Sequence, residues 1–274
     1  MYFPYGYKKT RAIELGQLVL KAYDQFECFT SNATWTLSEG YSLLKEISIG
    51  STHNTHDSFP DIIQSIFSSK KERNAPIGFI AKKNNALYII FRGTQTPSEW
   101  MSNINAVLKP YEYGGTGNVH NGFLELYKSI RETIIETIEK EGNKKNIHIA
   151  GHSLGAAIAT LSVMDIGQNQ NNNIKSVYLY GSPRVGDAAY VNDYNKKYRD
   201  ITYRIVNTSD IVTSVPPPVP VIGSIGGYFS HIDTAIDFNW QENDILKNHK
   251  MDKYLEEIKN TKEGLLLRII RKGA

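Results

Sequence analysis

Apolar residues recur along this chain with two different periods. Residues 10–26 and 121–141 carry apolar side chains at helical intervals, which predicts two amphipathic helices that pack against a core. Shorter apolar runs bounded by Gly, Asn or Ser predict buried strands instead. These runs lie at 75–94, where two of them are joined across "KKNN", and at 146–150, 174–180 and 202–206.

The order of these elements predicts the class of fold. Residues 154–164 follow a predicted strand directly and are rich in Ala and Leu at helical spacing, so we expect another helix there. The resulting alternation of strands and helices predicts an α/β fold with a mostly parallel central sheet flanked by helices. A chain of 274 residues, 41% of them apolar, can bury one large core, so we expect a single domain over residues 1–274.

Composition narrows the expected partners and cofactors. The formal net charge is +3 and the basic residues are spread along the chain, so no nucleic-acid partner is expected. Cys28 is the single cysteine, which argues against a thiolate metal site, and we expect neither a metal nor an organic cofactor. We find no signal-peptide pattern and no run approaching ~18 apolar residues, so the expected location is cytoplasmic or peripheral to a membrane. The sequence leaves the oligomeric state open.

The pentapeptide "GHSLG", residues 151–155, lies where a predicted strand meets a predicted helix. It matches the G-x-S-x-G nucleophile elbow, a sharp turn that presents a serine while the glycines avoid backbone clashes. Ser153 is therefore a candidate nucleophile. The alternative is a Gly-Ser turn that only lets the helix pack closely on the sheet. His152 points away from its neighbour at such a turn, so we interpret it as a packing residue.

A serine nucleophile needs an imidazole to take its proton and a carboxylate to orient that imidazole. Elbow folds supply these in the chain order Ser, acid, His, and two histidines follow Ser153, namely His231 and His249. Asp210 follows the predicted strand 202–206, at the sheet edge where Ser153 is expected. A loop position favours His249 over His231, but the residues alone leave both open.

Several motifs in family order resemble those of the class 3 (fungal-type) lipases, a branch of the α/β-hydrolase superfamily. They are "FRGT" with the following "EW", then "VHNGF", "IAGHSLGAAIA", "YLYGSPRVGD", "RIVNTSDIVTSVPP" and "NHKMDKY", spread over residues 75–255. The resemblance implies Ser153 as nucleophile, Asp210 as triad acid and His249 as general base, within an H-x-x-x-x-Y pattern that ends at Tyr254. It also implies that His231 stands outside the triad.

The tetrahedral intermediate of acyl transfer needs hydrogen-bond donors for its oxyanion. The sequence places two backbone amides for this, those of Leu154, directly after the nucleophile, and Thr94, at the end of "IIFRGT". Thr94 also fits a simpler role as a turn residue that caps the next helix. The resemblance implies a lid around residues 95–108, with Trp100 and Met101 as candidate lid residues; the alternative is that both simply belong to the core.

These features together predict a serine carboxylic-ester hydrolase that acts on lipid esters, triacylglycerol or phospholipid, through an acyl-enzyme. The alternatives are an inactive lipid-binding or regulatory protein on the same fold, or an acyltransferase. The expected partner is a lipid ester, at a membrane or lipid-droplet surface. Residues 212–227 form a long apolar loop, which we interpret either as a wall for an acyl chain or as a Pro-stiffened crossover on the core.

Overall fold

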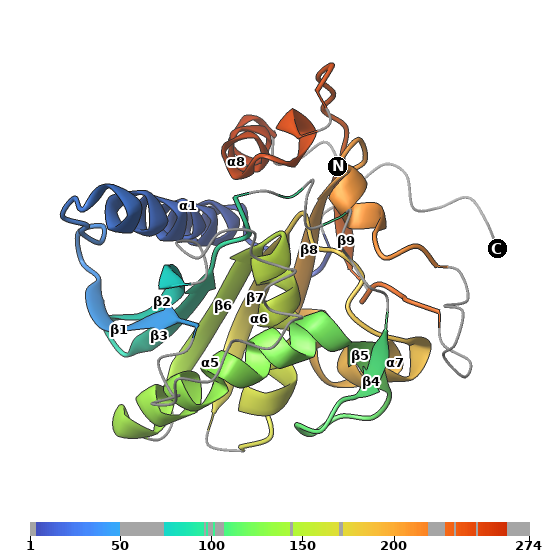
Figure 1. Cartoon of the computed structure of the whole chain (residues 1–274), viewed down its shortest axis with the longest axis horizontal. Coiled ribbons are helices and arrows are strands. Elements are labelled where there is room, and N and C mark those ends of the chain that lie inside the picture. Colours follow the sequence, from blue (N-terminus) through green and yellow to red (C-terminus); the bar gives the residue numbers. More distant parts are fainter. Residues whose placement is uncertain are drawn as a thin grey trace.

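A seven-stranded sheet lies at the centre of the computed structural model (Figure 1). The residues that the structure describes are 4–49, 74–95, 97, 101, 107–142, 145–169, 172–218, 228–232, 234–244 and 246–261. The strand order is β1-β2-β3-β6-β7-β8-β9. The strands are β1 (Ser42–Ser48), β2 (Pro76–Lys83), β3 (Ala86–Phe91), β6 (Asn146–His152), β7 (Asn173–Tyr180), β8 (Thr202–Asn207) and β9 (Ala235–Phe238).

The sheet is mostly parallel, as predicted. The hairpin β2–β3 and the pair β1–β2 are antiparallel, while β3, β6, β7, β8 and β9 run parallel to one another. A separate antiparallel pair joins β4 (Leu108–Pro110) and β5 (Asn118–His120). The helices are α1 (Lys9–Ser31), α5 (Asn121–Lys140), α6 (Leu154–Ile166), α7 (Ala188–Tyr198) and α8 (Met251–Asn260), with short 3-10 turns η1 (Arg199–Ile201), η2 (Ile211–Ser214) and η3 (Lys247–His249).

Two apolar cores lie on the two faces of this sheet. Side chains alternate between the faces along each strand, so Ile149 of β6 joins the core under α5 and α6, whereas Ala150 joins the core under α1 and α8. Figure 1 shows α1 and α8 next to each other, and the two helices are in contact. Because both faces are covered, the central strands are apolar along their length, which is why they were visible in the sequence.

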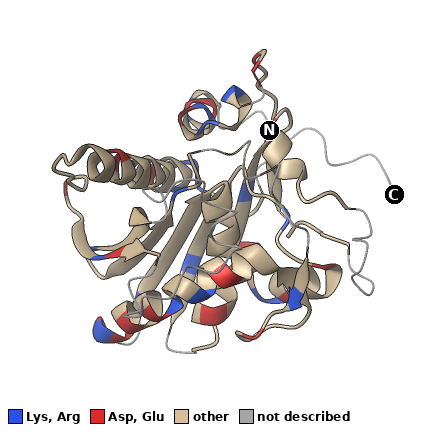
Figure 2. Ribbon diagram, in the orientation of Figure 1, with Lys and Arg blue, Asp and Glu red and all other residues tan. Residues whose placement is uncertain are grey.

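The helix α6 is buried on every side. All 13 of its residues are buried, so it lacks the polar face that marks most helices of globular proteins. It runs from the elbow into the core between β6 and α5 and fixes the direction of the turn before it. On the surface helix α5, by contrast, acidic and basic residues are interspersed, as Figure 2 shows.

Some elements differ from the expectations. Strand β1 lies in a stretch for which no strand was predicted, and helix α1 extends to Ser31 rather than ending at Phe26. Of the expected lid around 95–108, residues 96, 98–100 and 102–106 lie outside the described part, and so do residues 219–227 of the apolar stretch 212–227. Among the described helices, none is long and apolar enough to cross a bilayer.

Burial of His148 on β6 predicts a pH-dependent stability. Burial, followed by the nearby positive charge of Arg11, lowers the pKa of His148 to about 4, well below its ordinary value. Between these two values the unfolded chain binds more protons than the folded one, so the free energy of unfolding falls as the pH drops below ~6.5. We expect His148→Gln to flatten this dependence by about 1.4 kcal/mol per pH unit near pH 5. Urea unfolding at several pH values measures it, and equal slopes in parent and variant would contradict the prediction.

Candidate active site

Ser153 occupies the turn between β6 and α6. Its backbone has φ 58° and ψ −128°, a left-handed conformation that is rare for any residue other than glycine. The Ser153 N–H donates to the carbonyl of Tyr180 on β7, which holds the turn against the neighbouring strand. Strain of this kind costs of order 1–3 kcal/mol and is characteristic of functional turns. The turn therefore has the geometry that a nucleophile elbow requires.

Close backbone approach explains the two glycines of the pentapeptide. A Cβ atom on Gly151 would lie 2.2 Å from the carbonyl oxygen of Gly155. A Cβ atom on Gly155 would lie 2.4 Å from the carbonyl oxygen of Arg92, just beyond the end of β3. A side chain at 151 would push the start of α6 away from β6, and a side chain at 155 would push it away from the end of β3. The glycines thus bring the elbow next to the loop that carries Thr94.

Asp210 and His249 lie together although 39 residues separate them in the chain. Asp210 follows β8 and His249 ends η3, just before α8. The Nδ1 atom of His249 lies 2.6 Å from Oδ2 of Asp210, and both side chains are buried. Since a carboxylate only accepts, Nδ1–H donates, and in the neutral form of this ring the lone pair is then on Nε2. This is the tautomer that a general base needs.

A tyrosine and a backbone amide complete the surroundings of the Asp210 carboxylate. Tyr254 on α8 donates its hydroxyl to Oδ2 at 2.6 Å, and the Val212 N–H donates to Oδ1 at 2.9 Å. Burial, and then the negative charge of Asp210, raise the pKa of Tyr254 well above its ordinary value, so the hydroxyl remains a donor. In the sequence, Tyr254 was part of the H-x-x-x-x-Y pattern but had no predicted role. Its position in that pattern, after His249, was the only signal that the sequence offered.

In the described structure, three of the predicted site residues each carry a buried polar atom that makes no hydrogen bond. Within the described residues, Thr94 Oγ1, Ser153 Oγ and His249 Nε2 are buried and make no hydrogen bond. Most buried polar atoms in proteins are paired, and leaving one unpaired costs roughly 1–3 kcal/mol. Three such atoms therefore lie on the residues predicted as nucleophile, base and oxyanion donor. The structure thus places these residues at one edge of the sheet.

The predicted oxyanion donors also belong to this edge. Leu154 is the first residue of α6, where backbone N–H groups have no partner within the helix. Thr94 is buried, two residues after Arg92, whose carbonyl borders the elbow. The loop between them passes so close to the elbow that a Cβ atom on Gly93 would lie 2.7 Å from Cβ of Ser153.

The remaining predicted residues lie elsewhere. The Nε2–H of His231 donates to the carbonyl of Thr213 at 2.6 Å. Burial lowers the pKa of His231 to about 3. Trp100 lies outside the described residues. Met101 is half-buried and packs against the core, so its contacts fit the core interpretation and leave its lid role a prediction.

Two further side chains make contacts that the local sequence does not reveal. Asp187 is buried; it caps α7 by accepting from the Tyr190 N–H at 2.9 Å and also binds Asn118. His152, interpreted as a packing residue, has both ring nitrogens within hydrogen-bonding distance of other groups. Neither partner set can be deduced from sequence, because the partners lie far away in the chain.

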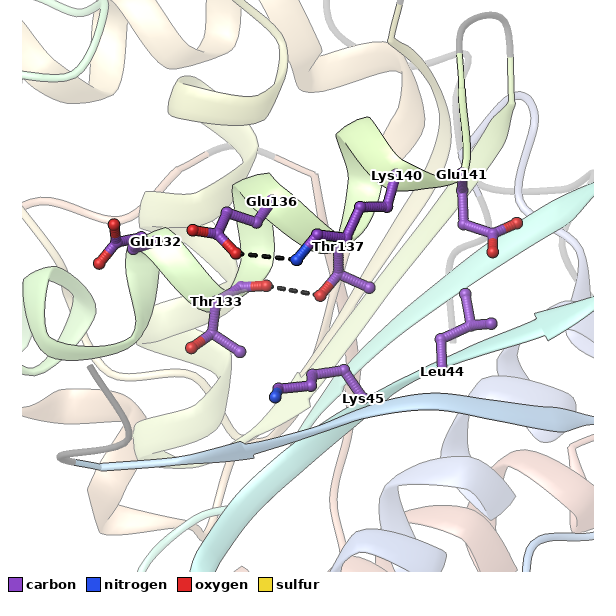
Figure 3. Close-up of a pocket in the computed structure, with 8 residues that line it drawn as sticks. All are labelled: Leu44, Lys45, Glu132, Thr133, Glu136, Thr137, Lys140 and Glu141. Carbon is purple, nitrogen blue, oxygen red and sulfur yellow. Dashed lines mark hydrogen bonds and ion pairs between the residues drawn. The ribbon is translucent and has the colours of Figure 1, made fainter.

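A cavity of about 450 Å³ lies between β1 and α5 (Figure 3) and includes none of the predicted site residues. Its acidic and basic groups are partly paired, as in the contact of Lys140 with Glu136 at 3.0 Å. It is lined by Leu44, Lys45, Glu132, Thr133, Glu136, Thr137, Lys140 and Glu141. In the part of the chain that the structure describes, no cluster of three His, Cys, Asp or Glu side chains is suited to a metal ion.

A mostly parallel sheet with helices on both faces and a serine at a strand-to-helix elbow defines an α/β-hydrolase. Residues 88–219 match the family model of lipase (class 3). The chain belongs to the class 3 lipase family. The matched stretch contains Thr94, Ser153 and Asp210 but ends before His249, so the case for His249 rests on its contact with Asp210.

Individual relatives agree with this family. The chain is 31% identical over 249 residues to phospholipase A(1) DAD1, chloroplastic, of Arabidopsis thaliana, across 74% of this chain and 55% of the relative. It is 33% identical over 140 residues to a lipase of Rhizomucor miehei, across 48% of this chain and 38% of the relative. It therefore spans about half or less of the length of these curated relatives. The crystal structure of Lip2 lipase from Yarrowia lipolytica shares the fold, with a TM-score of 0.60 at 20% identity over 84% of this chain and 79% of that one.

Proposed function

We propose that this protein hydrolyses carboxylic esters of lipids through a covalent acyl-enzyme. One observation carries the proposal. Ser153 Oγ and His249 Nε2 are both buried without a hydrogen bond in the described structure, and the Asp210 carboxylate sets the tautomer of His249. Arrangements of this kind recur in serine hydrolases of unrelated folds. The family and the names of the relatives, which include lipases and a phospholipase A(1), support a lipid ester as the substrate.

In the first half-reaction, His249 Nε2 takes the hydroxyl proton of Ser153 while Oγ bonds to the ester carbonyl carbon. The carbonyl π electrons move to oxygen, and the resulting oxyanion accepts hydrogen bonds from the N–H groups of Leu154 and Thr94 and from the Thr94 hydroxyl. When the carbonyl re-forms, the alcohol leaves with the proton from His249. Water then repeats the sequence on the acyl-enzyme and releases the fatty acid. Asp210 stays ionised throughout and orients the imidazole.

The surface beside the site supports action at a lipid surface. Ile211, directly after Asp210, is a large apolar side chain and is 45% exposed. An exposed apolar side chain next to the proposed triad acid suits contact with aggregated substrate. We propose a single catalytic domain over residues 1–274 with a lid around 95–108, and a membrane or droplet surface as its place of work.

A series of p-nitrophenyl esters of increasing acyl length tests this proposal. We expect hydrolysis that increases with chain length and is followed by activity on glycerides and phospholipids. A fluorophosphonate probe should label Ser153 in the same preparations. Folded protein that neither hydrolyses the esters nor takes the label would support a lipid-binding role on the same fold. Acyl transfer to an added alcohol in place of hydrolysis would identify an acyltransferase.

Thr94→Val is expected to separate activity from stability. Loss of the hydroxyl removes one oxyanion donor, so kcat should fall roughly 10²-fold. The melting temperature should stay the same or rise, because the lost hydroxyl is buried without a partner in the described structure. The matched control is Thr160→Val, which removes the hydroxyl that donates to the Ala156 carbonyl at 2.9 Å. The control should lose stability and keep kcat. Full activity of Thr94→Val would show that the Thr94 hydroxyl does not stabilise the oxyanion.

A further inference from the structure

The hydroxyl of Tyr23, on α1, lies where three segments of the proposed site meet. The Gly93 N–H donates to Tyr23 Oη at 2.9 Å, and Oη lies 2.7 Å from Nδ1 of His152. On the other side of the ring, Nε2 of His152 lies 2.8 Å from the backbone oxygen of His249. A helix outside the catalytic edge thus contacts the loop before Thr94, the elbow and the segment of the proposed base.

These contacts have a definite direction. A carbonyl oxygen only accepts, so Nε2 of His152 carries a proton and donates a hydrogen bond to the backbone carbonyl of His249. Burial, and next the proximity of His249, lower the pKa of His152 well below its ordinary value, so the ring is neutral. Its Nδ1 then carries a lone pair and accepts from Tyr23. The bonds run from the Gly93 N–H through Tyr23 and His152 to the His249 carbonyl.

Packing leaves little freedom around this row of bonds. The rings of His152 and His249 are stacked, with centroids 4.5 Å apart and an interplanar angle of 29°. The Tyr23 ring lies edge-on to His152 at 5.8 Å. A Cβ atom on Gly93 would come within 2.7 Å of Tyr23 Oη. Any shift of the hydroxyl therefore moves the loop or the imidazole.

We propose that Tyr23 and His152 are positioning residues that couple the oxyanion loop to the general base through this hydrogen-bonded bridge. The inference rests on the proposed function, and neither residue exchanges atoms with the substrate. The bridge fixes the peptide before Thr94, and with it the direction of the Thr94 amide. It also holds the His249 backbone, so that the ring can contact Asp210 and Ser153 together. A misplacement of ~1 Å in such a site costs about 10²-fold in rate.

Tyr23→Phe tests the bridge with the loss of one oxygen atom. We expect kcat on p-nitrophenyl butyrate to fall 10–100-fold while KM stays within about twofold, because alignment is lost and substrate contacts are kept. The matched control is Tyr178→Phe. Tyr178 Oη also accepts from a backbone N–H and pairs with a backbone carbonyl, both of Lys8 and both at 3.1 Å, but it lies away from the site. The control should lower the melting temperature similarly and leave kcat unchanged.

Two variants of His152 divide the bridge into its halves. His152→Gln places an amide N–H near the position of Nε2 and loses the partner of Tyr23, whereas His152→Asn keeps an acceptor near Nδ1 and loses the bond to His249. Adding Tyr23→Phe to His152→Gln should lower kcat by less than the two single losses combined, because both substitutions remove the Tyr23–His152 bond and only the bond from the Gly93 N–H is left to lose. Additive losses, an unchanged kcat in Tyr23→Phe, or an equal loss in Tyr178→Phe would each overturn the proposal.

A measurement independent of turnover keeps the bridge and the proposed function apart. ¹⁵N NMR of the imidazole should show His152 as the Nε2–H tautomer in the parent and a shifted Nδ1 resonance in Tyr23→Phe. A parent protein with this signature and no esterase activity would contradict the proposed function and retain the bridge. An Nδ1–H tautomer of His152 in the parent would overturn the bridge whatever the activity.

Discussion

Ser153→Ala is expected to abolish ester hydrolysis, with kcat falling about 10⁵- to 10⁶-fold. The substitution removes the atom that bonds to the acyl carbon, and the oxyanion donors and substrate binding alone leave a residual acceleration of only about 10³- to 10⁴-fold over water. Stability should be unchanged or slightly higher, because Ser153 Oγ is buried and makes no hydrogen bond in the described structure. Steady-state kinetics and thermal unfolding of the same preparation check both parts.

Two further variants sharpen this experiment. Ser162→Ala removes another buried hydroxyl from α6, one that donates to the Ala159 carbonyl at 2.8 Å, and it should keep full kcat. Ser153→Gly should be inactive as well, yet more stable than Ser153→Ala by about 1–2 kcal/mol, because glycine adopts the positive φ without strain. Turnover within tenfold of the parent in folded Ser153→Ala would exclude Ser153 as the nucleophile.

The sequence predicted the parts of the fold in which burial imposes a pattern. Strands β3, β6, β7 and β8 are covered on both faces and read as apolar runs, and the elbow is a local motif with glycines that backbone contacts demand. The edge strand β1 was not predicted because only part of one face is buried: Ile47 is fully buried while Leu43 is 43% exposed. An edge strand of this kind has no periodicity strong enough to separate it from a connector.

The candidate site was predictable residue by residue but not as a network. Chain order and strand ends pointed to Ser153 and Asp210, whereas the residues alone left His231 and His249 as alternatives. The fold separates them, since His231 binds the Thr213 carbonyl and His249 contacts Asp210. The contacts of Tyr23 and Tyr254 depend on which helices cover the sheet face next to the elbow. Such tertiary contacts leave no periodic signal in a single sequence.

Asp210→Asn is expected to lower kcat about 10⁴-fold while leaving most of the fold intact. Three donors converge on this carboxylate, from His249, Tyr254 and Val212, and an amide offers a single acceptor oxygen. His249 relieves the conflict by accepting at Nδ1, which moves its proton to Nε2 and leaves no base facing Ser153. One donor remains unpaired, so the free energy of unfolding should fall by roughly 1–3 kcal/mol.

Asp165→Asn is the matched control for this loss. Asp165 is also buried, accepts from the Tyr127 hydroxyl at 2.6 Å and pairs with a basic side chain, Arg131, at 2.6 Å, but it lies at the far end of α6 from the elbow. It should lose comparable stability and keep kcat, because no reacting atom depends on it. A kcat loss as large in Asp165→Asn would mean that general destabilisation explains the effect at Asp210. A loss confined to Asp210→Asn would show that the carboxylate acts through the tautomer of His249.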